Sequence, residues 1–236
     1  MNEESVVVVL LAHNEIETIE TDLRNWKMLL AGNFLRWRIL VGEDGSTDGT
    51  DLFLTSHAEQ YNLTRVSKPG QRGYKAAFLN CLREAGDSWV IFADTGNKFV
   101  VQEILALWNL RHQDGLVVGR RSPRSDGLGR RALSFAYSRF ISMLFDLPMV
   151  RDVDSGIRVY SPRSIKYLLS TDLGFSHFIS SEITIRLIQG GFQYREFPIP
   201  YSGREGRSRG VPPSKILFLS LTGFTQALKL HRRKRR

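Results

Sequence analysis

RILVGEDGSTDGTDLF, residues 38–53, is the stretch that decides the fold of this chain. Residues 38–41, which are aliphatic after Arg38, are typical of a buried strand, and the Gly, Asp and Ser of residues 42–49 are typical of a turn. Thr50 or Asp51 is then a suitable N-cap for a helix that extends to Ala58. In an open α/β sheet, ligands bind at the carboxyl ends of the strands. The turn places three carboxylates at that edge, those of Glu43, Asp44 and Asp48.

The acidic turn also has to be compared with a calcium-binding loop. Asp44, Ser46 and Asp48 stand at the first, third and fifth positions of such a loop. Its twelfth position is Thr55, which lacks the bidentate carboxylate that calcium requires. A calcium site is therefore not expected, and a solvated turn without chemistry is the remaining alternative to a pocket.

Further strands and helices alternate on both sides of this stretch. Trp89–Asp94 is a short apolar run that ends on a carboxylate, and Val6–Leu11 is another apolar run before the first helix. Helical periodicity covers residues 15–30 and 72–84. The resulting order β-α-β-α-β-α-β predicts an α/β fold with a mostly parallel sheet flanked by helices.

Several segments together resemble one known family over residues 5 to about 224. They are VVVVLLAHNE, VGEDGSTDGT, QRGYKAA, FADTGNKF, VVGRR, LGRRALSFAYSRF, RDVDSGIRVYSP, SSEITIRLIQGGFQYREFPIPY and REGRSR. In this order and spacing they are similar to family 2 glycosyltransferases with the Rossmann-like GT-A fold. Within that family they resemble the polyprenyl-phosphate sugar synthases of the dolichol-phosphate mannose synthase type. The resemblance implies transfer of a sugar from a nucleotide-sugar donor to a polyprenyl phosphate, with inversion.

The resemblance also implies a donor-binding set. The opening strand of the family usually ends in Pro and an aromatic residue, where this chain has Leu11 and His13. His13 either stacks on the base of the nucleotide or is structural. The donor-binding residues implied are Ala12, His13, Glu15, Glu43, Asp44, Arg72 and Lys98.

The segment FADTGNKF stands where the family has a metal-binding Asp-x-Asp. Asp94 is retained, whereas the second carboxylate is replaced by Gly96 and a frequent further ligand by Lys98. Magnesium often relies on one or two carboxylates plus substrate phosphates, so Asp94 with a diphosphate is still a possible Mg²⁺ or Mn²⁺ site. We expect that site to be weakened and the metal to be dispensable in part. Lys98 either supplies positive charge to the diphosphate or points to solvent.

Arginines dominate the chain after residue 116, and guanidinium groups bind phosphate in a bidentate manner. They include Arg120, Arg121, Arg124, Arg130, Arg131, Arg139, Arg151, Arg158, Arg204, Arg207 and Arg209. By resemblance, the acceptor and phosphate contacts are Arg120, Arg131 and Arg204 with Ser208. A solvated basic face is the interpretation preferred for Arg121, Arg124, Arg139 and Arg151.

Three acidic residues complete the predicted site. Asp152 matches a family aspartate and would orient an arginine or the sugar, or act as a base toward a hydroxyl acceptor; a structural turn carboxylate is the alternative. Asp154 stands where the family commonly has a small polar residue. Glu182, in a helix expected over residues 181–189, matches an acidic position near the sugar and joins the acceptor set. The catalytic residues predicted are Asp94, Asp152 and Arg131.

Composition fits one domain of this kind. The 236 residues are 42% hydrophobic, which is enough for one core, and the single Cys81 excludes an internal disulfide. We expect a catalytic domain over residues 1–210 and an amphipathic helix with a basic tail over residues 211–236. Polar residues 1–5 give no sign of a secretory signal.

The basic ending HRRKRR carries part of the formal net charge of +9. The apolar residues 216–228 before it are too few to span a bilayer, so we expect a cytoplasmic protein peripherally bound to a membrane surface. Docking on a membrane-spanning partner protein and a plain core helix are the alternatives for this segment. Nucleic acid is not expected as a partner, because no recognition motif accompanies the basic run. Residues 131–150 are expected to form a core or acceptor-groove helix rather than a membrane insert.

Three functions remain open on the sequence. The first is the polyprenyl-phosphate glycosyltransferase. The second is a related transferase with a hydroxyl acceptor on a glycan, protein or small molecule. The third is a non-catalytic relative that binds nucleotide or lipid, which the changes at Gly96 and Lys98 would allow.

Overall fold

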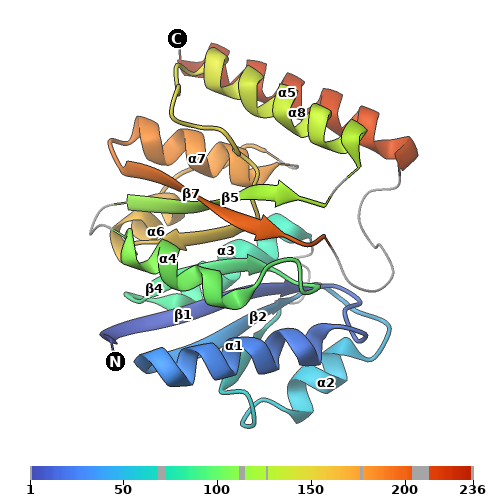
Figure 1. The fold of residues 1–236 in the computed structure, drawn as a ribbon, viewed down its shortest axis with the longest axis vertical. Coiled ribbons are helices and arrows are strands. Elements are labelled where there is room, and N and C mark those ends of the chain that lie inside the picture. Colours follow the sequence, from blue (N-terminus) through green and yellow to red (C-terminus); the bar gives the residue numbers. More distant parts are fainter. Residues whose placement is uncertain are drawn as a thin grey trace.

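One seven-stranded sheet runs through the whole molecule (Figure 1). The computed structural model describes residues 2–68, 73–111, 115–125, 127–175, 178–203 and 213–234, and it describes side chains in the last segment for residues 222–232. The strand order is β3-β2-β1-β4-β6-β5-β7. The strands are β1 (Asn2–Ala12), β2 (Phe34–Glu43), β3 (Leu63–Val66), β4 (Trp89–Asp94), β5 (Gly115–Arg124), β6 (Ile157–Tyr160) and β7 (Gln193–Tyr201).

The sheet is parallel except at β6. That strand is antiparallel to both of its neighbours, with Val90 opposite Tyr160 on β4 and Val118 opposite Arg158 on β5. The pairs β1–β2, β1–β4, β2–β3 and β5–β7 are all parallel. The expectation of a mostly parallel α/β sheet flanked by helices is therefore confirmed. Because β6 runs backwards, its first residue lies at the edge where the other strands end.

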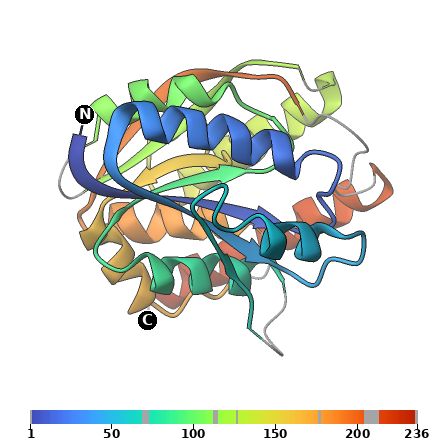
Figure 2. The same ribbon diagram turned by 90° about the horizontal axis from the view of Figure 1, so that it is seen from below.

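Helices cover both faces of the sheet, with α1 on one face and α3 on the other (Figure 2). The first half of the chain contributes α1 (Ile19–Asn33), α2 (Thr50–Ser56), α3 (Tyr74–Ala85), the 3-10 helix η1 (Val101–Glu103) and α4 (Ile104–Asn109). The second half contributes α5 (Leu128–Leu144), α6 (Pro162–Leu169), α7 (Ile179–Gln189) and α8 (Pro213–Lys234).

Strand β1 shows why these segments fold in this way. Its residues alternate between the two faces, so that Val6 and Val8 pack with the α1 side and Val7 and Val9 pack with the α3 side. All four side chains are fully buried. A strand buried on both faces needs a continuous apolar run rather than an alternating one, and VVVVLL provides it.

The observed boundaries refine those expected from sequence. Helix α1 begins at Ile19 instead of residue 15, because the N–H of Glu15 donates to Thr50 Oγ1 at 2.8 Å and holds residues 15–18 in a turn. The expected N-cap of α2 is wrong by a residue or two. Gly49 takes that position with a φ of +96°, and Asp48 Oδ1 accepts the N–H of Thr50 at 3.1 Å.

A third apolar cluster joins α5, α7 and α8 at one end of the molecule. Phe224 of α8 packs against Tyr137 and Phe140 of α5, with ring centroids 5.4 and 4.7 Å apart, and Ala227 is fully buried. Phe224 and Ala227, which belong to the segment 216–228 expected to lie on a membrane surface, thus face the protein, whereas Leu228 is exposed. Across the described residues, none of the helices has the length and apolar character needed to cross a membrane.

Candidate active site

The carboxyl ends of β1, β2 and β4 meet at one edge of the sheet. Leu11 is opposite Asp94, and Ala12 is opposite Glu43, so three segments far apart in sequence reach the edge together. The loop before β6 arrives at the same place, since the N–H of Asp94 donates to the carbonyl of Gly156 at 2.8 Å. The acidic turn, the Asp94 segment and the residues 152–156 therefore form one polar site.

The loop after β1 and the acidic turn after β2 interlock. Asn14 Oδ1 accepts the N–H of Thr47 at 2.7 Å, and Ser46 Oγ accepts the N–H of Asn14 at 2.9 Å. His13 Nδ1 lies 3.0 Å from the carbonyl oxygen of Asp44, and Asp44 Oδ1 accepts the N–H of Gly73 at 2.5 Å. The turn is therefore a fixed element of the site rather than a freely solvated loop.

The predicted donor residues of these two loops differ in exposure. Ala12, Glu15 and Glu43 are buried, whereas His13 is exposed. Burial opposes ionisation of Glu43, but the hydrogen bonds from Ser46 and Gly45 and the charge of Arg65 hold its pKa below the ordinary value. Arg72 lies outside the described residues.

The turn after β4 is held by hydrogen bonds to Asp22 of α1. Its carboxylate accepts the N–H of Gly96 at 2.7 Å and that of Asn97 at 3.1 Å. Burial raises the pKa of Asp22 to about 6, although both backbone hydrogen bonds favour the ionised form. Directly after this turn, Lys98 Nζ lies 3.1 Å from Asp94 Oδ2.

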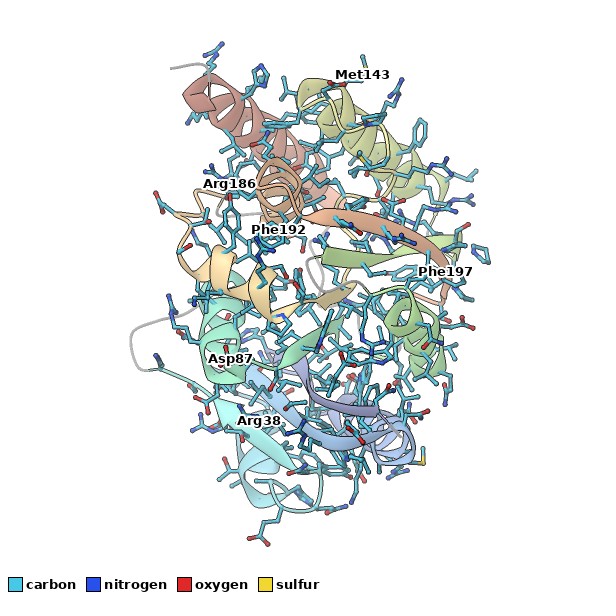
Figure 3. All side chains as sticks on the ribbon, turned by 90° about the vertical axis from the view of Figure 1, so that its left-hand side faces the viewer. Arg38, Asp87, Met143, Arg186, Phe192 and Phe197 are labelled. Atoms are coloured by element: carbon cyan, nitrogen blue, oxygen red, sulfur yellow. The ribbon has the colours of Figure 1, made fainter. Side chains whose placement is uncertain are left out.

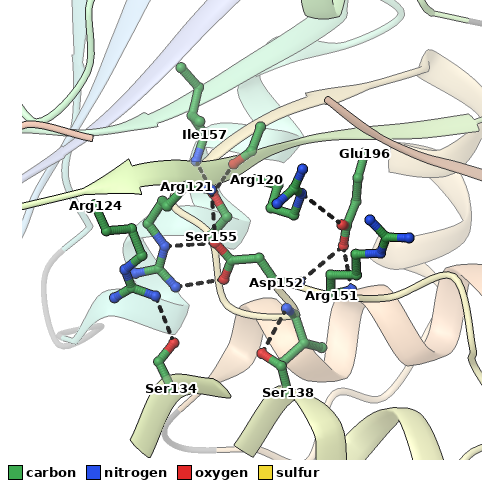
Figure 4. Close-up of polar contacts among 12 residues, drawn as sticks. Arg120, Arg121, Arg124, Ser134, Ser138, Arg151, Asp152, Ser155, Ile157 and Glu196 are labelled. Carbon is green, nitrogen blue, oxygen red and sulfur yellow. Dashed lines mark hydrogen bonds and ion pairs between the residues drawn. The ribbon is translucent and has the colours of Figure 1, made fainter. Parts of the chain in front are cut away.

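The loop before β6 presents Asp152 to Arg121 at the end of β5 (Figure 4). The N–H and Nε of Arg121 donate to Asp152 Oδ2 at 3.0 and 2.8 Å, and Nη2 donates to Oδ1 at 2.6 Å. Burial opposes ionisation of Asp152, but these hydrogen bonds and the charge of Arg121 hold its pKa below the ordinary value. Asp152 thus holds an arginine, which was one of the roles expected for it.

Asp154 differs from Asp152 in its ionisation. Burial and the negative charges of Asp152 and Asp94 raise the pKa of Asp154 to about 6, against the opposing charges of Arg121 and Arg158. A carboxyl group with such a pKa exchanges a proton near neutral pH, which suits general acid–base work. In the sequence, this residue stands out only as a departure from the family pattern.

Half-buried Glu196, to which the sequence assigns no role, and fully buried Arg158 brace the same loop. Glu196 Oε1 on β7 accepts the N–H of Arg151 at 2.8 Å and that of Asp152 at 3.0 Å. Arg158 is fully buried, and its donors reach the carbonyls of Val153 and Ser155 at 2.7 Å each. Arg158 also binds the Ser180 carbonyl and Thr184 Oγ1 on α7. Its inclusion among the phosphate-facing arginines is therefore wrong, because its guanidinium is occupied by the protein.

A basic pocket of about 430 Å³ opens between β5, α5 and the loop before β6. Five arginines line it, together with Asp152, Ser134, Phe135, Ser142, Pro148 and Val150. The arginines are Arg120, Arg121, Arg124, Arg139 and Arg151. We call this cavity the arginine pocket. The solvated-face interpretation is wrong for Arg121, whose side chain is only 12% exposed and is paired with Asp152. Arg139 and Arg151 are exposed, as that interpretation expects, and Arg124 is half-buried, but the packing of β5 against α5 also brings these three side chains to the lining of the pocket.

Of the predicted acceptor residues that the structure describes, only Arg120 lines the arginine pocket. Arg120 lines the arginine pocket, with Nε 3.8 Å from Glu196 Oε2, whereas Arg131 is exposed on the first turn of α5 and does not line it. Glu182 is fully buried in α7, where its carboxylate accepts the N–H groups of Gly174 and Phe175 at 3.0 and 2.6 Å. The structure thus does not bring Glu182 to the arginine pocket. Arg204 and Ser208 lie outside the described residues.

Comparisons with known proteins agree with this fold. The model of the family described as glycosyl transferase family 2 matches residues 7–169. Among solved structures, glucosyl-3-phosphoglycerate synthase from Mycobacterium tuberculosis in complex with phosphoglyceric acid is 20% identical, with a TM-score of 0.71. That similarity covers 96% of this chain and 79% of the other. The same enzyme in complex with Mn²⁺, UDP and glucosyl-3-phosphoglycerate gives a TM-score of 0.69 at 20% identity over 97% and 80% of the two chains. Likewise, its complex with Mn²⁺, UDP-glucose and glycerol 3-phosphate gives 0.68 at 20% identity, over 97% and 80%.

Proposed function

Since this chain belongs to glycosyl transferase family 2, we propose that it transfers a sugar, with inversion, from a nucleotide-sugar donor to a polyprenyl phosphate. The use of a nucleotide-sugar donor follows from the family. The acceptor is our proposal. The observation that carries it is the arginine pocket, which lies directly beside Asp152.

The proposed reaction places different demands on the two parts of the site. The donor would bind at the loops after β1, β2 and β4. The departing diphosphate gains negative charge as the sugar leaves, so fixed donors and cations at this edge stabilise it. Opposite it, the acceptor phosphate attacks the anomeric carbon, and the protein has to hold the two reacting groups in line.

A phosphate acceptor explains why the pocket needs cations more than a base. The second pKa of a phosphate monoester is about 6, so the attacking oxygen is already ionised at neutral pH. Guanidinium forks bind such a group in a bidentate manner and lower the cost of bringing it to the reaction centre. Asp152 serves this arrangement by keeping Arg121 charged and oriented.

The surface around the pocket supports a lipid as the carrier of that phosphate. Leu128, Phe135 and Met143 of α5 are exposed, and Phe135 also lines the arginine pocket. Met143 lies at the outer end of the molecule (Figure 3). Their spacing of seven and eight residues puts them on one face of the helix. Apolar side chains next to arginines suit a membrane surface with anionic headgroups, so we propose peripheral membrane binding on this side.

A small phosphorylated molecule with a hydroxyl acceptor is a second candidate. The solved structures named above contain phosphoglyceric acid or glycerol 3-phosphate, and the arginine pocket would suit such a phosphate as well. A hydroxyl acceptor requires a base. Asp154, with a pKa raised to about 6 by burial, suits that role better than Asp152.

The test is a product assay on the purified chain. A panel of nucleotide sugars is incubated with undecaprenyl phosphate, dolichyl phosphate or 3-phosphoglycerate, with Mg²⁺, Mn²⁺ or chelator, and products are identified by mass. A glycosyl phospholipid is the expected product. A glycosylated phosphoglycerate without a lipid product would replace the proposal by the second candidate. Nucleotide binding without any transfer or donor hydrolysis would leave a non-catalytic binder.

A further inference from the structure

The side chains of Asp94 and Lys98 form an ion pair at the carboxyl end of β4. Lys98 Nζ lies 3.1 Å from Asp94 Oδ2, and the two side chains are only 20% and 28% exposed. The backbone of Lys98 is fixed as well, because its carbonyl accepts the N–H of Ser202 at 3.1 Å and the next residue, Phe99, bridges to Tyr201. The ammonium group is therefore held at the donor edge of the sheet.

The turn between the two residues is built to carry this pair. Gly96 has a φ of +94° and Asn97 a φ of +49°, and both N–H groups are bound by the buried carboxylate of Asp22. Left-handed conformations of this kind favour Gly and Asn. The turn thus brings Lys98 back over the end of the strand while it leaves position 96 without a side chain.

These residues do not fit a divalent cation. Mg²⁺ and Mn²⁺ are bound by several oxygen ligands, and here one carboxylate oxygen already accepts from an ammonium group. A dication bound to Asp94 would lie beside that positive charge and be repelled by it. Throughout the described part of the chain, no cluster of three or more His, Cys, Asp or Glu side chains is arranged to hold a metal.

We infer that the ammonium group of Lys98 neutralises the donor diphosphate, so that this chain binds nucleoside diphosphates without a divalent metal. The inference rests on the proposed nucleotide-sugar donor. Asp94 then acts as a positioning residue that holds the Lys98 side chain at the edge of the sheet. An ammonium group at this position stabilises the diphosphate of the bound donor. It stabilises the leaving diphosphate more strongly, because the negative charge on that group increases during transfer.

The experiment is a calorimetric binding titration of the full chain with UDP, GDP, dTDP, CDP and ADP. Each titration is performed in EDTA and in excess Mn²⁺ or Mg²⁺. For the nucleotide that binds best, we expect dissociation constants that agree within about threefold between these conditions. Lys98→Gln should weaken binding in EDTA by about tenfold, since it removes one charge-assisted contact. Lys98→Arg should retain most of the affinity, and Lys27→Gln on α1 is the matched control that should change nothing.

Lys98→Glu gives a second and independent readout. It places two carboxylates four residues apart and removes the ammonium, so binding by this variant should require Mn²⁺. Thermal unfolding of every variant shows that it is folded. Loss of wild-type binding in EDTA, or unchanged binding by Lys98→Gln, would overturn the inference and leave the nucleotide-sugar donor standing. If none of the five nucleotides binds the wild-type chain under any condition, both the inference and the proposed donor fail.

Discussion

Arg121 and Asp152 are joined by three hydrogen bonds, from the N–H, Nε and Nη2 of the arginine to the two oxygens of the carboxylate. The pair links the end of β5 to the loop before β6 and forms one wall of the arginine pocket. Both side chains are largely buried, so neither charge is compensated by water.

Replacing one partner of this pair should destabilise the protein strongly. Arg121→Ala leaves the Asp152 carboxylate buried and unpaired, and we expect a loss of about 3–5 kcal/mol in the free energy of unfolding. Chemical denaturation of Arg121→Ala, Asp152→Ala and the double variant measures the coupling. Single losses that add up in the double variant would show that the two residues are energetically independent.

Asp154 should make stability depend on pH between about 4 and 6. Its pKa is raised to about 6 by burial, so in this range the folded chain binds more protons than the unfolded chain and stability falls as pH rises. We expect Asp154→Asn to be more stable than the wild type at pH 7.5 by about 1–2 kcal/mol, allowing for the partial exposure of the side chain. At pH 4 the difference should vanish. Asp87→Asn, at an exposed position, is the control, and an equal pH response of the two variants would contradict the assignment.

Arg139 should matter for the acceptor and little for the fold. Its side chain is exposed on α5 and lines the arginine pocket, so Arg139→Ala removes a cation without leaving a buried charge. We expect the KM for a phosphate-bearing acceptor to rise about tenfold, with the KM for the donor unchanged. Arg24→Ala, which removes an exposed ion pair on α1, is the matched control. A similar KM change in both variants would show that the pocket does not select the acceptor.

Gly156 is predicted to be intolerant of any side chain. A Cβ at this position would lie 2.2 Å from Asp94 Oδ2, so alanine forces the carboxylate away from Lys98. We expect Gly156→Ala to lower turnover by about 100-fold through this displacement. Gly32→Ala, where nothing lies within 4 Å of the new Cβ, should keep full activity and gain up to about 1 kcal/mol in stability. Full activity of Gly156→Ala would mean that the position of Asp94 is not critical.

Phe135 should contribute to membrane binding. It is 70% exposed on α5 and lines the pocket, and burying a Phe side chain in an apolar environment contributes about 1.5–3 kcal/mol. Phe135→Ser should therefore bind anionic phospholipid vesicles at least about tenfold more weakly in a sedimentation assay. Leu52→Ser on α2, at a side chain that is 74% exposed, is the matched control and should bind like the wild type. Equal loss in both variants would remove the support for docking through α5.

The first half of the fold was predictable from sequence because its strands are local, continuous signals. Trp89–Asp94 is an unbroken apolar run, and its observed limits agree with those expected. Strand β6 carries Arg158 in its middle, and a charged residue there argues against a buried strand. Only tertiary contacts with the carbonyls of Val153, Ser155 and Ser180 make that arginine acceptable in the core.

The site also has a part that the sequence indicates and a part that only the packing creates. The acidic turn after β2 lies where the pattern of strand, turn and helix indicated. The arginine pocket was missed, because Arg121 of β5, Arg139 of α5 and Arg151 of the loop before β6 become neighbours only through packing. Likewise, nothing in the sequence reveals that Lys98 turns back onto Asp94, since that depends on Asp22 holding the intervening turn.

The reversed direction of β6 also has a consequence for how the chain is made. Strand β4 is next to β1 on one side, but its other side stays an unpaired apolar edge until residues 157–160 have been synthesised. At about 5–20 residues per second, that interval on the ribosome is roughly 3–13 s. During it the nascent chain exposes a strand edge of the kind that promotes aggregation. Slow translation between Asp94 and Ile157 would therefore lower the yield of soluble protein, whereas slow translation after Tyr160 would not.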